Sequence, residues 1–214
     1  IDALLMLGYC YRSGDLGLEQ DSRKAMEIYR QVADAGEAAG YYGLAFGYHY
    51  GVGVEEDEAE AVRLYTIAAD MGDTGAAFEL AERYAKGRGV PRDRAKVAHY
   101  YTIAAEAGIN DARYMLGCCY RDGYGVEVDA AKAFHLFWLV GMNPTKDDRA
   151  WGHRAWVALG QCYERGFGTE KDLGKAVYWY REAAWQEKWE GVYELGRCWE
   201  QGIVVPRDLD RALY

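Results

Sequence analysis

The stretch that decides the fold is residues 76–108, AAFELAERYAKGRGVPRDRAKVAHYYTIAAEAG. Three residues stand at fixed distances from Leu80. A small residue, Ala76, lies four positions before it, an aromatic residue, Tyr84, lies four positions after it, and a glycine, Gly87, lies seven positions after it. Positions four apart lie on one side of a helix, so this part predicts a helix with a single packing face. Gly87 suits the left-handed conformation that commonly ends such a helix.

The same pattern recurs along the whole chain. The leucine returns at intervals of 37, 36, 36, 43 and 36 residues, at Leu7, Leu44, Leu80, Leu116, Leu159 and Leu195. The small residues four before are Ala3, Gly40, Ala76, Ala112, Ala155 and Gly191. The aromatic residues four after are Tyr11, Tyr48, Tyr84, Tyr120, Tyr163 and Trp199. The glycines seven after are Gly14, Gly51, Gly87, Gly123, Gly166 and Gly202. We call this predicted helix of each unit helix A and number its positions from the leucine, position 0.

A second helix, helix B, is predicted after an aspartate that recurs in every unit. These aspartates are Asp21, Asp57, Asp93, Asp129, Asp172 and Asp208. Aspartate is a favoured N-cap, and Asp57 with Glu60 predicts a capping box. Apolar residues then follow a period of 3.6, as in Ala61, Leu64, Tyr65 and Ala68. Each unit is therefore predicted to be a helix hairpin that buries its apolar face against its neighbours.

These residues resemble the Sel-one-like repeat family, which is related to the tetratricopeptide repeat. The matching core is Leu80, Ala81, Tyr84, Gly87, Gly89, Val90 and Asp93, followed by Tyr101, Ala104, Ala105 and Gly108. The resemblance covers nearly six units and implies an all-α fold, a right-handed α/α superhelical solenoid of about six helix-turn-helix repeats. It also implies an adaptor role in protein complexes, although no single activity comes with this fold.

The sequence predicts one solenoid over residues 1–214 rather than several domains. Its units span about 1–36, 37–72, 73–108, 109–151, 152–187 and 188–214. The fourth unit has seven extra residues, and this insertion at 141–152 fits either a contact loop or a neutral insertion. Neither end looks like a polar capping unit, so we expect the repeats to continue beyond both ends.

Composition narrows the classes of partner. The formal net charge is −9 with a pI near 5.0, and no run of basic residues is present, which argues against nucleic acid. No apolar stretch approaches the roughly 18 residues of a membrane helix, so no membrane insertion is predicted. The chain opens without the features of a signal peptide. The compartment and the oligomeric state stay open, with a reducing, cytoplasmic setting favoured by the cysteines.

Candidate chemistry is sparse, and we predict no catalytic residue, cofactor site or metal site. The Gly-x-Gly-Val loops, as at Gly51–Val54 and Gly87–Val90, could suggest a phosphate cradle. They follow a helix and recur in nearly every unit, so we interpret them as structural turns.

The cysteines and histidines also favour a structural interpretation. The cysteines are Cys10, Cys118, Cys119, Cys162 and Cys198, four of them at position +3 of helix A. Equivalent positions on stacked helices lie roughly 8–10 Å apart, too far for a disulfide, so we expect reduced thiols. The histidines, expected to be exposed or half-buried, are His49, His99, His135 and His153.

By analogy with tetratricopeptide repeats, positions −5, −2, +2, +5 and +6 of helix A face a concave groove. The partner-binding residues predicted there, with Trp151 from the insertion, are Tyr9, Arg12, Tyr42, Phe46, His49, Tyr50, Phe78, Glu82, Tyr114, Arg121 and Trp151. Tyrosine, phenylalanine and arginine suit such a role because they are enriched in binding interfaces. The other interpretation is that the residues at −2 pack between neighbouring helices A.

The leading functional hypothesis is a scaffold or adaptor that binds a protein or peptide segment on the concave helix A surface. The alternative, suggested by the habits of the family, is a bacterial envelope or host-interaction factor that recognises a glycan or a secreted protein. An enzyme ranks last, because no nucleophile–base pair or metal cage is visible in the sequence. A pair of carboxylates of the glycosidase kind stays open.

Overall fold

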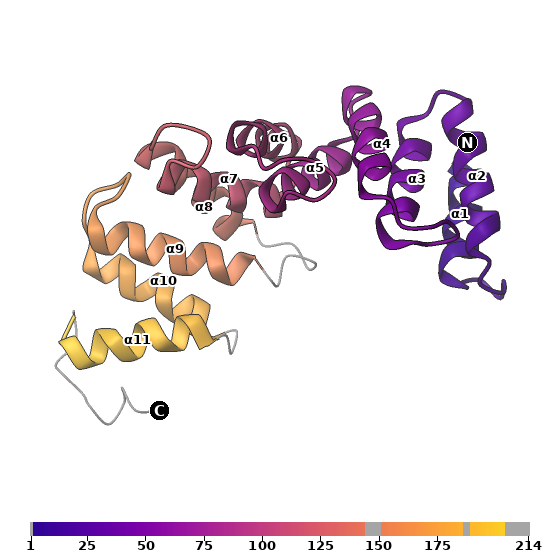
Figure 1. The fold of residues 1–214 in the computed structure, drawn as a ribbon. Coiled ribbons are helices and arrows are strands. Elements are labelled where there is room, and N and C mark those ends of the chain that lie inside the picture. Colours follow the sequence, from indigo (N-terminus) through magenta and orange to yellow (C-terminus); the bar gives the residue numbers. More distant parts are fainter. Residues whose placement is uncertain (1, 144–150, 186–188, 204–214) are drawn as a thin grey trace. The chain divides into compact units, whose positions relative to one another are not determined.

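The computed structural model describes residues 2–143, 151–185 and 189–203, which form eleven α-helices and no strand (Figure 1). The helices are α1 (Asp2–Ser13), α2 (Ser22–Asp34), α3 (Ala38–Tyr50), α4 (Glu58–Asp70), α5 (Thr74–Lys86), α6 (Arg94–Glu106), α7 (Asn110–Asp122), α8 (Ala130–Met142), α9 (Gly152–Arg165), α10 (Leu173–Trp185) and α11 (Trp189–Gln201). No helix in these ranges combines the length and the apolar character that a membrane crossing needs. The predicted all-α repeat fold is confirmed.

Helices of the two kinds alternate along the chain. The odd-numbered helices are the helices A and the even-numbered helices are the helices B. The chain divides after Ala107 into two compact units, which we call the first and the second compact unit. Within each of them, successive helices pack against one another. The helix B expected after Asp208, and residues 144–150 of the insertion, lie outside the described residues.

The loop that joins the two helices of a hairpin depends on two left-handed glycines, as the third repeat shows. Gly87 ends α5 with a φ of 73°, and its N–H donates to the carbonyl oxygen of Arg83. Gly89 has a φ of 69°, and a Cβ at this residue would lie 2.2 Å from the carbonyl oxygen of Glu58 in α4. The loop is thus pressed against the preceding helix B, which supports a turn rather than a phosphate cradle.

Aspartate side chains cap the helices B as predicted. In five helices the aspartate carboxylate accepts a hydrogen bond, at 2.9–3.1 Å, from the backbone N–H three residues further along the chain. These aspartates are Asp21, Asp57, Asp93, Asp129 and Asp172. The capping box predicted at Asp57 is wrong in its second half. The Glu60 carboxylate does not turn back to Asp57, because the Arg63 guanidinium binds it at 2.6 Å from Nη2 to Oε1.

Each described helix B carries a buried ring, and the ring of α2 fills the space between two helices A. Tyr29 of α2 lies between α1 and α3, where a Cβ on Gly8 or Gly43 would stand 2.9 or 2.6 Å from its ring. The equivalent buried rings are Tyr65, Tyr101, Phe137 and Tyr180. Gly8 and Gly43 thus make room for the ring that joins the first hairpin to the second.

The leucine at position 0 is buried in most repeats, and in the fifth repeat it packs on the preceding helix B. Leu159 of α9, for example, reaches to 2.9 Å from the point where a Cβ on Gly141 of α8 would lie. The other buried leucines of this set are Leu44, Leu80, Leu116 and Leu195. The expectation of burial is wrong for Leu7, which is 38% exposed.

The cysteines are free thiols, and those at position +3 are buried. They serve as small apolar side chains of the core. The expectation for the histidines is wrong for His153, which is only 7% exposed. Its Nε2 lies 3.9 Å from Glu190 Oε2, because α9 and α11 pack together over this residue.

Candidate functional site

Most of the predicted binding residues belong to the first compact unit. These are Tyr9, Arg12, Tyr42, Phe46, His49, Tyr50, Phe78 and Glu82, whereas Tyr114, Arg121 and Trp151 belong to the second. The two groups are therefore considered separately.

Four of these residues form a continuous surface on α1 and α3, which we call the aromatic strip: Tyr9, Arg12, Phe46 and Tyr50. The Arg12 guanidinium lies 5.0 Å from the centroid of the Tyr9 ring and 4.3 Å from that of Phe46. The Phe46 ring in turn lies 4.4 Å from the Tyr50 ring. Tyr9 is 47% exposed and Tyr50 is 56% exposed. Attraction between the guanidinium and the ring faces holds this surface together.

Two of the rings at position −2, those of Tyr42 and Tyr114, are half-buried and pack on the helix B of their own hairpin. Tyr42 lies 5.5 Å from Tyr65, and Tyr114 lies 5.6 Å from Phe137, measured between ring centroids. Both also reach the next helix A. Tyr42 approaches Gly75 at the start of α5, and Tyr114 lies 5.2 Å from the Trp151 ring at the start of α9. Tyr42 and Tyr114 therefore lie between consecutive helices A, whereas Tyr193, at the same position of α11, is 65% exposed.

Phe78 and Glu82 of α5 contact the buried tyrosine of α6. The Phe78 ring lies 5.8 Å from that of Tyr101, whose hydroxyl donates to Glu82. Lys86 also pairs with Glu82. Burial acts to raise the pKa of Glu82, but the hydrogen bonds from Lys86 and Tyr101 outweigh it and hold the pKa below its usual range. Glu82 is thus a charged residue with its acceptors already engaged inside the hairpin.

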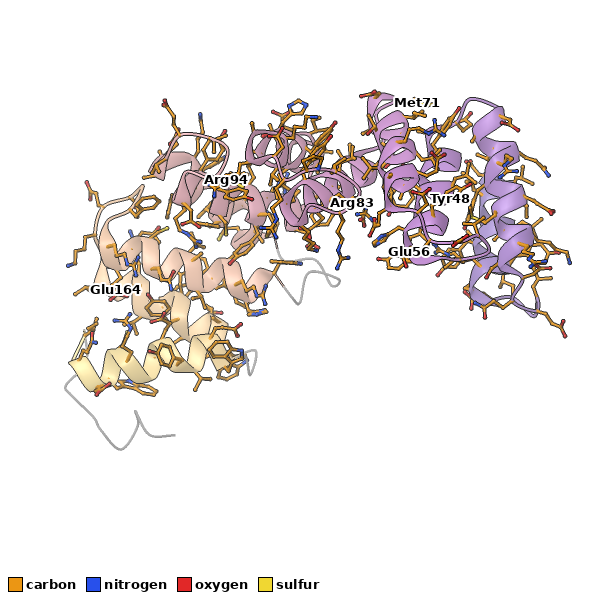
Figure 2. All side chains as sticks on the ribbon, viewed as in Figure 1. Tyr48, Glu56, Met71, Arg83, Arg94 and Glu164 are labelled. Atoms are coloured by element: carbon orange, nitrogen blue, oxygen red, sulfur yellow. The ribbon has the colours of Figure 1, made fainter. Side chains whose placement is uncertain are left out.

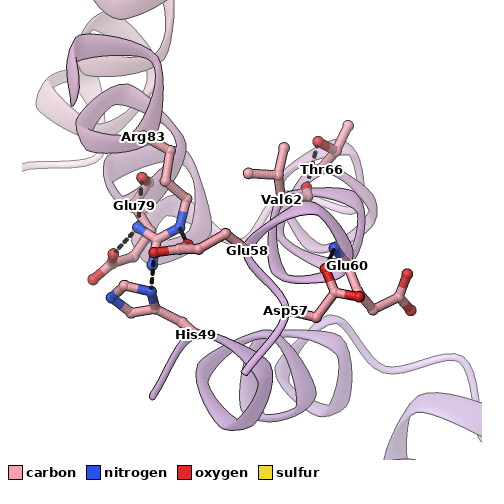
Figure 3. Close-up of polar contacts among 8 residues, drawn as sticks. All are labelled: His49, Asp57, Glu58, Glu60, Val62, Thr66, Glu79 and Arg83. Atoms are coloured by element: carbon pink, nitrogen blue, oxygen red, sulfur yellow. Dashed lines mark hydrogen bonds and ion pairs between the residues drawn. The ribbon is translucent and has the colours of Figure 1, made fainter. Parts of the chain in front are cut away.

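A buried arginine on α5 is the functional candidate that the sequence reasoning missed. The side chain of Arg83 is 3% exposed and its guanidinium lies 4.6 Å from the centroid of the Tyr65 ring of α4. Figure 2 marks Arg83 on the whole chain. Arg83 Nη1 donates to Glu79 Oε2 at 2.7 Å, and Arg83 Nε lies 3.8 Å from Glu58 Oε2 (Figure 3). We call Glu58, Tyr65, Glu79 and Arg83 the Arg83 cluster.

His49 connects the Arg83 cluster to the aromatic strip. Its Nδ1 lies 3.0 Å from Glu58 Oε1, on the side of that carboxylate opposite its contact with Arg83 (Figure 3). Its ring lies 4.1 Å from the Tyr50 ring. Of the predicted residues, His49 therefore contacts both the exposed ring of Tyr50 and the charged side chains of the Arg83 cluster.

One signal in the sequence could have revealed the cluster. Arg83 occupies position +3 of its helix A, where four other repeats have a cysteine and the second has Gly47. A charged residue in a column of small buried residues must have polar groups beside it, since an unpaired buried charge is strongly unfavourable. Only the folded chain shows that Glu58 and Glu79 supply them.

In the second compact unit, Arg121 is engaged by its neighbour in the chain. Its Nε and Nη2 each donate to the carboxylate of Asp122 at 2.8 Å. Trp151 is covered on one face by Arg154, whose guanidinium lies 4.9 Å from the ring. Tyr114, Arg121 and Trp151 thus form local contacts of their own, and no exposed strip like that of Tyr9 and Tyr50 joins all three.

A second polar network lies where α9, α10 and α11 meet. Arg197 donates to Glu164 at 2.9 Å from Nη1 to Oε1 and to Glu194 at 2.8 Å from Nε to Oε2. The Tyr180 hydroxyl donates to Glu164 at 2.7 Å, and Gln161 donates to Glu194 at 3.1 Å. Burial raises the pKa of Tyr180, and the hydrogen bond to Glu164 raises it further.

The thiols are not placed for nucleophilic chemistry. Burial raises the pKa of Cys119 to about 12 and those of Cys162 and Cys198 to about 11. A nucleophilic cysteine needs the opposite shift, because the thiolate is the reactive form. Within the described ranges, no three side chains of histidine, cysteine, aspartate or glutamate gather as ligands for a metal ion.

Solved structures of two proteins resemble the whole chain. One is a protective antigen present in uropathogenic Escherichia coli strains that displays an SLR fold, with a TM-score of 0.85 and 27% identity. The match covers 99% of this chain but 44% of that one, so this chain spans less than half of its length. The other is a Sel1 repeat protein from Oxalobacter formigenes, with a TM-score of 0.77, 26% identity and coverage of 99% and 82%.

A comparison with curated proteins gave no match. The Sel1 repeat model, in contrast, matches six segments, which are residues 1–37, 38–73, 74–109, 110–137, 157–185 and 189–214. Five of these segments contain at least most of a described helix hairpin, and together they cover most of the chain. The chain therefore belongs to the Sel1 repeat family.

Proposed function

We propose that this chain is a protein-interaction scaffold that binds a segment of a partner protein along the aromatic strip. Sel1 repeat proteins are generally scaffolds for protein–protein interaction, and the fold is typically non-catalytic. The observation that carries the proposal is the continuous surface of Tyr9, Arg12, Phe46 and Tyr50 on two helices A, in which both tyrosines are exposed. Aromatic and arginine side chains supply most of the binding energy at protein interfaces.

The test is a selection of random peptides displayed on phage against the folded chain, followed by affinity measurements on synthetic peptides. We expect the variant Tyr9→Ser/Tyr50→Ser to bind the selected peptides at least ~10-fold more weakly, which corresponds to about 1.4 kcal/mol. Fluorescence anisotropy measures the affinity, and circular dichroism checks that the helical content is unchanged. Both tyrosines are largely exposed, so the change leaves the core intact.

The matched control is Tyr178→Ser on the helix B α10. Tyr178 is 52% exposed, close to the exposure of Tyr50, but it lies outside the helix A surface. Its replacement is expected to leave peptide affinity unchanged. Peptides that bind the double variant as well as the parent chain would show that the aromatic strip is not the binding surface.

A second candidate function is a host-interaction factor that recognises a glycan or a secreted protein. The similarity to a protective antigen of uropathogenic E. coli favours it, although this chain spans 44% of that protein's chain. A glycan array and a binding screen against secreted host proteins would test it. Binding to a glycan that survives Tyr9→Ser/Tyr50→Ser would favour this candidate over the peptide scaffold.

A further inference from the structure

The unmet hydrogen-bonding groups of the described chain are concentrated in one place. Within residues 2–143, 151–185 and 189–203, four buried side-chain atoms have no hydrogen-bond partner: Glu58 Oε2, Tyr65 Oη, Arg83 Nε and Arg83 Nη2. All four belong to the Arg83 cluster. Buried polar atoms are almost always hydrogen-bonded, because a lost bond to water must be replaced. These four atoms can therefore form further hydrogen bonds, although Arg83 Nε and Glu58 Oε2 already face each other as an ion pair at 3.8 Å.

The repeat fold itself does not require the arginine. A cysteine or a glycine at position +3 carries no charge that needs polar partners. The other described repeats have such residues there, namely Cys10, Gly47, Cys119, Cys162 and Cys198. The first residue of helix B is likewise charged in the second repeat, at Glu58, but apolar in the fifth, at Leu173. The third repeat thus carries a buried charge, Arg83, where the same fold elsewhere uses small side chains, and the second repeat places the half-buried Glu58 beside it.

We propose that the Arg83 cluster recognises the side-chain carboxamide of an asparagine or glutamine in the partner segment. This inference rests on the proposed scaffold function and specifies the chemistry of the segment. Arg83 Nε and Nη2 offer N–H donors, Glu58 Oε2 offers an acceptor, and Tyr65 Oη can do either. A carboxamide carries an acceptor oxygen and two N–H donors on one carbon, so it can meet both kinds of group together.

The charges of the cluster disfavour other side chains. Arg83 already lies between two carboxylates, 2.7 Å from Glu79 and 3.8 Å from Glu58, so a third carboxylate would be repelled. A lysine ammonium has no acceptor and would leave the arginine donors unmet. An aliphatic side chain would leave all four atoms unmet. The neutral side chain with both a donor and an acceptor fits best.

The aromatic strip leads the partner segment to this cluster. Tyr50 is exposed and its ring packs at a tilt against His49, whose imidazole contacts Glu58. A segment lying on Tyr50 places its carboxamide next to His49, and the imidazole turns aside as the amide reaches Glu58 and Arg83. Changes of side-chain rotamer of this kind are common when interfaces form.

The first experiment needs no partner and uses the variant Glu58→Leu/Arg83→Cys, which installs the residues found at Leu173 and Cys198. It removes three of the four unmet atoms, and water can reach the partly exposed Glu79 that it leaves behind. We expect the midpoint of chemical unfolding, measured under reducing conditions, to stay the same or rise. A clear fall would mean that the cluster holds the fold together and would overturn the proposal.

The second experiment compares peptides selected on the parent chain with those selected on this variant. We expect asparagine or glutamine to be enriched at one position on the parent only. Among synthetic peptides, the glutamine peptide is expected to bind the parent at least ~10-fold more tightly than its leucine or glutamate counterpart. The variant should bind the three alike.

The matched control is Glu60→Leu/Arg63→Cys, which makes the same two replacements at an exposed ion pair of the same helix, α4. It is expected to leave the amide preference intact. Selected peptides without an amide preference, bound equally by the parent and by Glu58→Leu/Arg83→Cys, would overturn this inference while leaving the scaffold function standing.

Two further outcomes are decisive. If no peptide is enriched on the parent chain, the scaffold function and this inference fail together. If a crystal structure of a peptide complex shows an ordered water bonded to Arg83 and Glu58 in place of the peptide amide, the cluster is a hydration site and the inference is overturned.

Discussion

The junction of α3, α4 and α5 can be compared with the junction of α9, α10 and α11, because both contain the same kinds of side chain. Each has a buried tyrosine on helix B, Tyr65 or Tyr180, and a glutamate at position −1 of the next helix A, Glu79 or Glu194. Each also has an arginine on that helix. In the second junction every one of these groups is hydrogen-bonded, whereas in the first the tyrosine hydroxyl and two arginine nitrogens are not.

Two differences in position account for the contrast. Arg197 is at +2 and Arg83 at +3, and one residue turns a side chain by about 100° around a helix. Arg197 therefore stays partly exposed, whereas Arg83 enters the seam beside Tyr65. The two junctions also differ at position +5 of the preceding helix A. Glu164 accepts a hydrogen bond from the Tyr180 hydroxyl. The equivalent residue of the other junction, His49, contacts Glu58 instead, and the Tyr65 hydroxyl has no hydrogen-bond partner. Similar residues thus form a fully hydrogen-bonded junction in one place, whereas in the other several buried polar atoms have no hydrogen-bond partner.

The largest expected effect tests what the two junctions share. Tyr65→Ala and Tyr180→Ala each remove a fully buried ring from between two helices A. We expect each to lower the free energy of unfolding by about 3–5 kcal/mol, from lost burial and the cavity left behind. Urea unfolding followed by circular dichroism measures it. A loss below about 1 kcal/mol at either residue would show that its ring is not part of the core.

The next effect separates the junctions through their arginines. Arg197→Met leaves Glu164 and Glu194 without their shared donor, and we expect a loss of about 1–2 kcal/mol, discounted because all three side chains are partly exposed. The loss should shrink at high salt, which screens the charges. Arg181→Met, at an exposed site on α10, is the control and should change little. An equal loss for the control would contradict a specific role of Arg197.

A smaller effect distinguishes the two tyrosine hydroxyls. Tyr180→Phe removes a hydrogen bond to Glu164 and is expected to cost about 1 kcal/mol. Tyr65→Phe removes a buried hydroxyl that has no partner, so stability should be unchanged or slightly higher. The comparison uses the difference between the two unfolding free energies. If Tyr65→Phe destabilises as much as Tyr180→Phe, the Tyr65 hydroxyl must be bonded, for instance to an ordered water.

The smallest effect is a dependence on pH at the second junction. Burial acts to raise the pKa of Glu164, but hydrogen bonds from Arg197 and Tyr180 outweigh it and hold the pKa below its ordinary value of 4.5. A lowered folded-state pKa stabilises the fold above that ordinary value, and the contribution is lost as the pH falls through the folded-state pKa. Unfolding midpoints of the parent chain should therefore fall more steeply below pH 4.5 than those of Arg197→Met. Parallel curves would contradict this.

Much of the fold could be predicted from local chemistry. Gly87 must accept a left-handed backbone and Asp57 must cap a helix, and both requirements are met by residues close in the chain. The capping box failed because a competing partner, Arg63, lay one turn further along the same helix. Spacing alone could not predict which leucines at position 0 are buried, since Leu7 shares the spacing of Leu44 but is more exposed.

The candidate site was only partly predictable. The helix period identified the exposed Tyr9 and Tyr50, since position on a helix decides which side chains share a face. It could not show that Arg12 would stack on Phe46, or that Tyr42 would settle against Tyr65. Those contacts join residues from different helices, and their geometry follows from how the hairpins pack.

By itself, the order of residues determined the repeat length, the alternation of helices A and B, the caps and the columns of small and aromatic side chains. These features depend on interactions within about one helical turn or on a spacing that repeats. Only the tertiary structure decided that Arg83 is buried with unmet donors while Arg197 is fully paired. Hydrogen bonds require specific distances and angles, and packing between hairpins sets those distances.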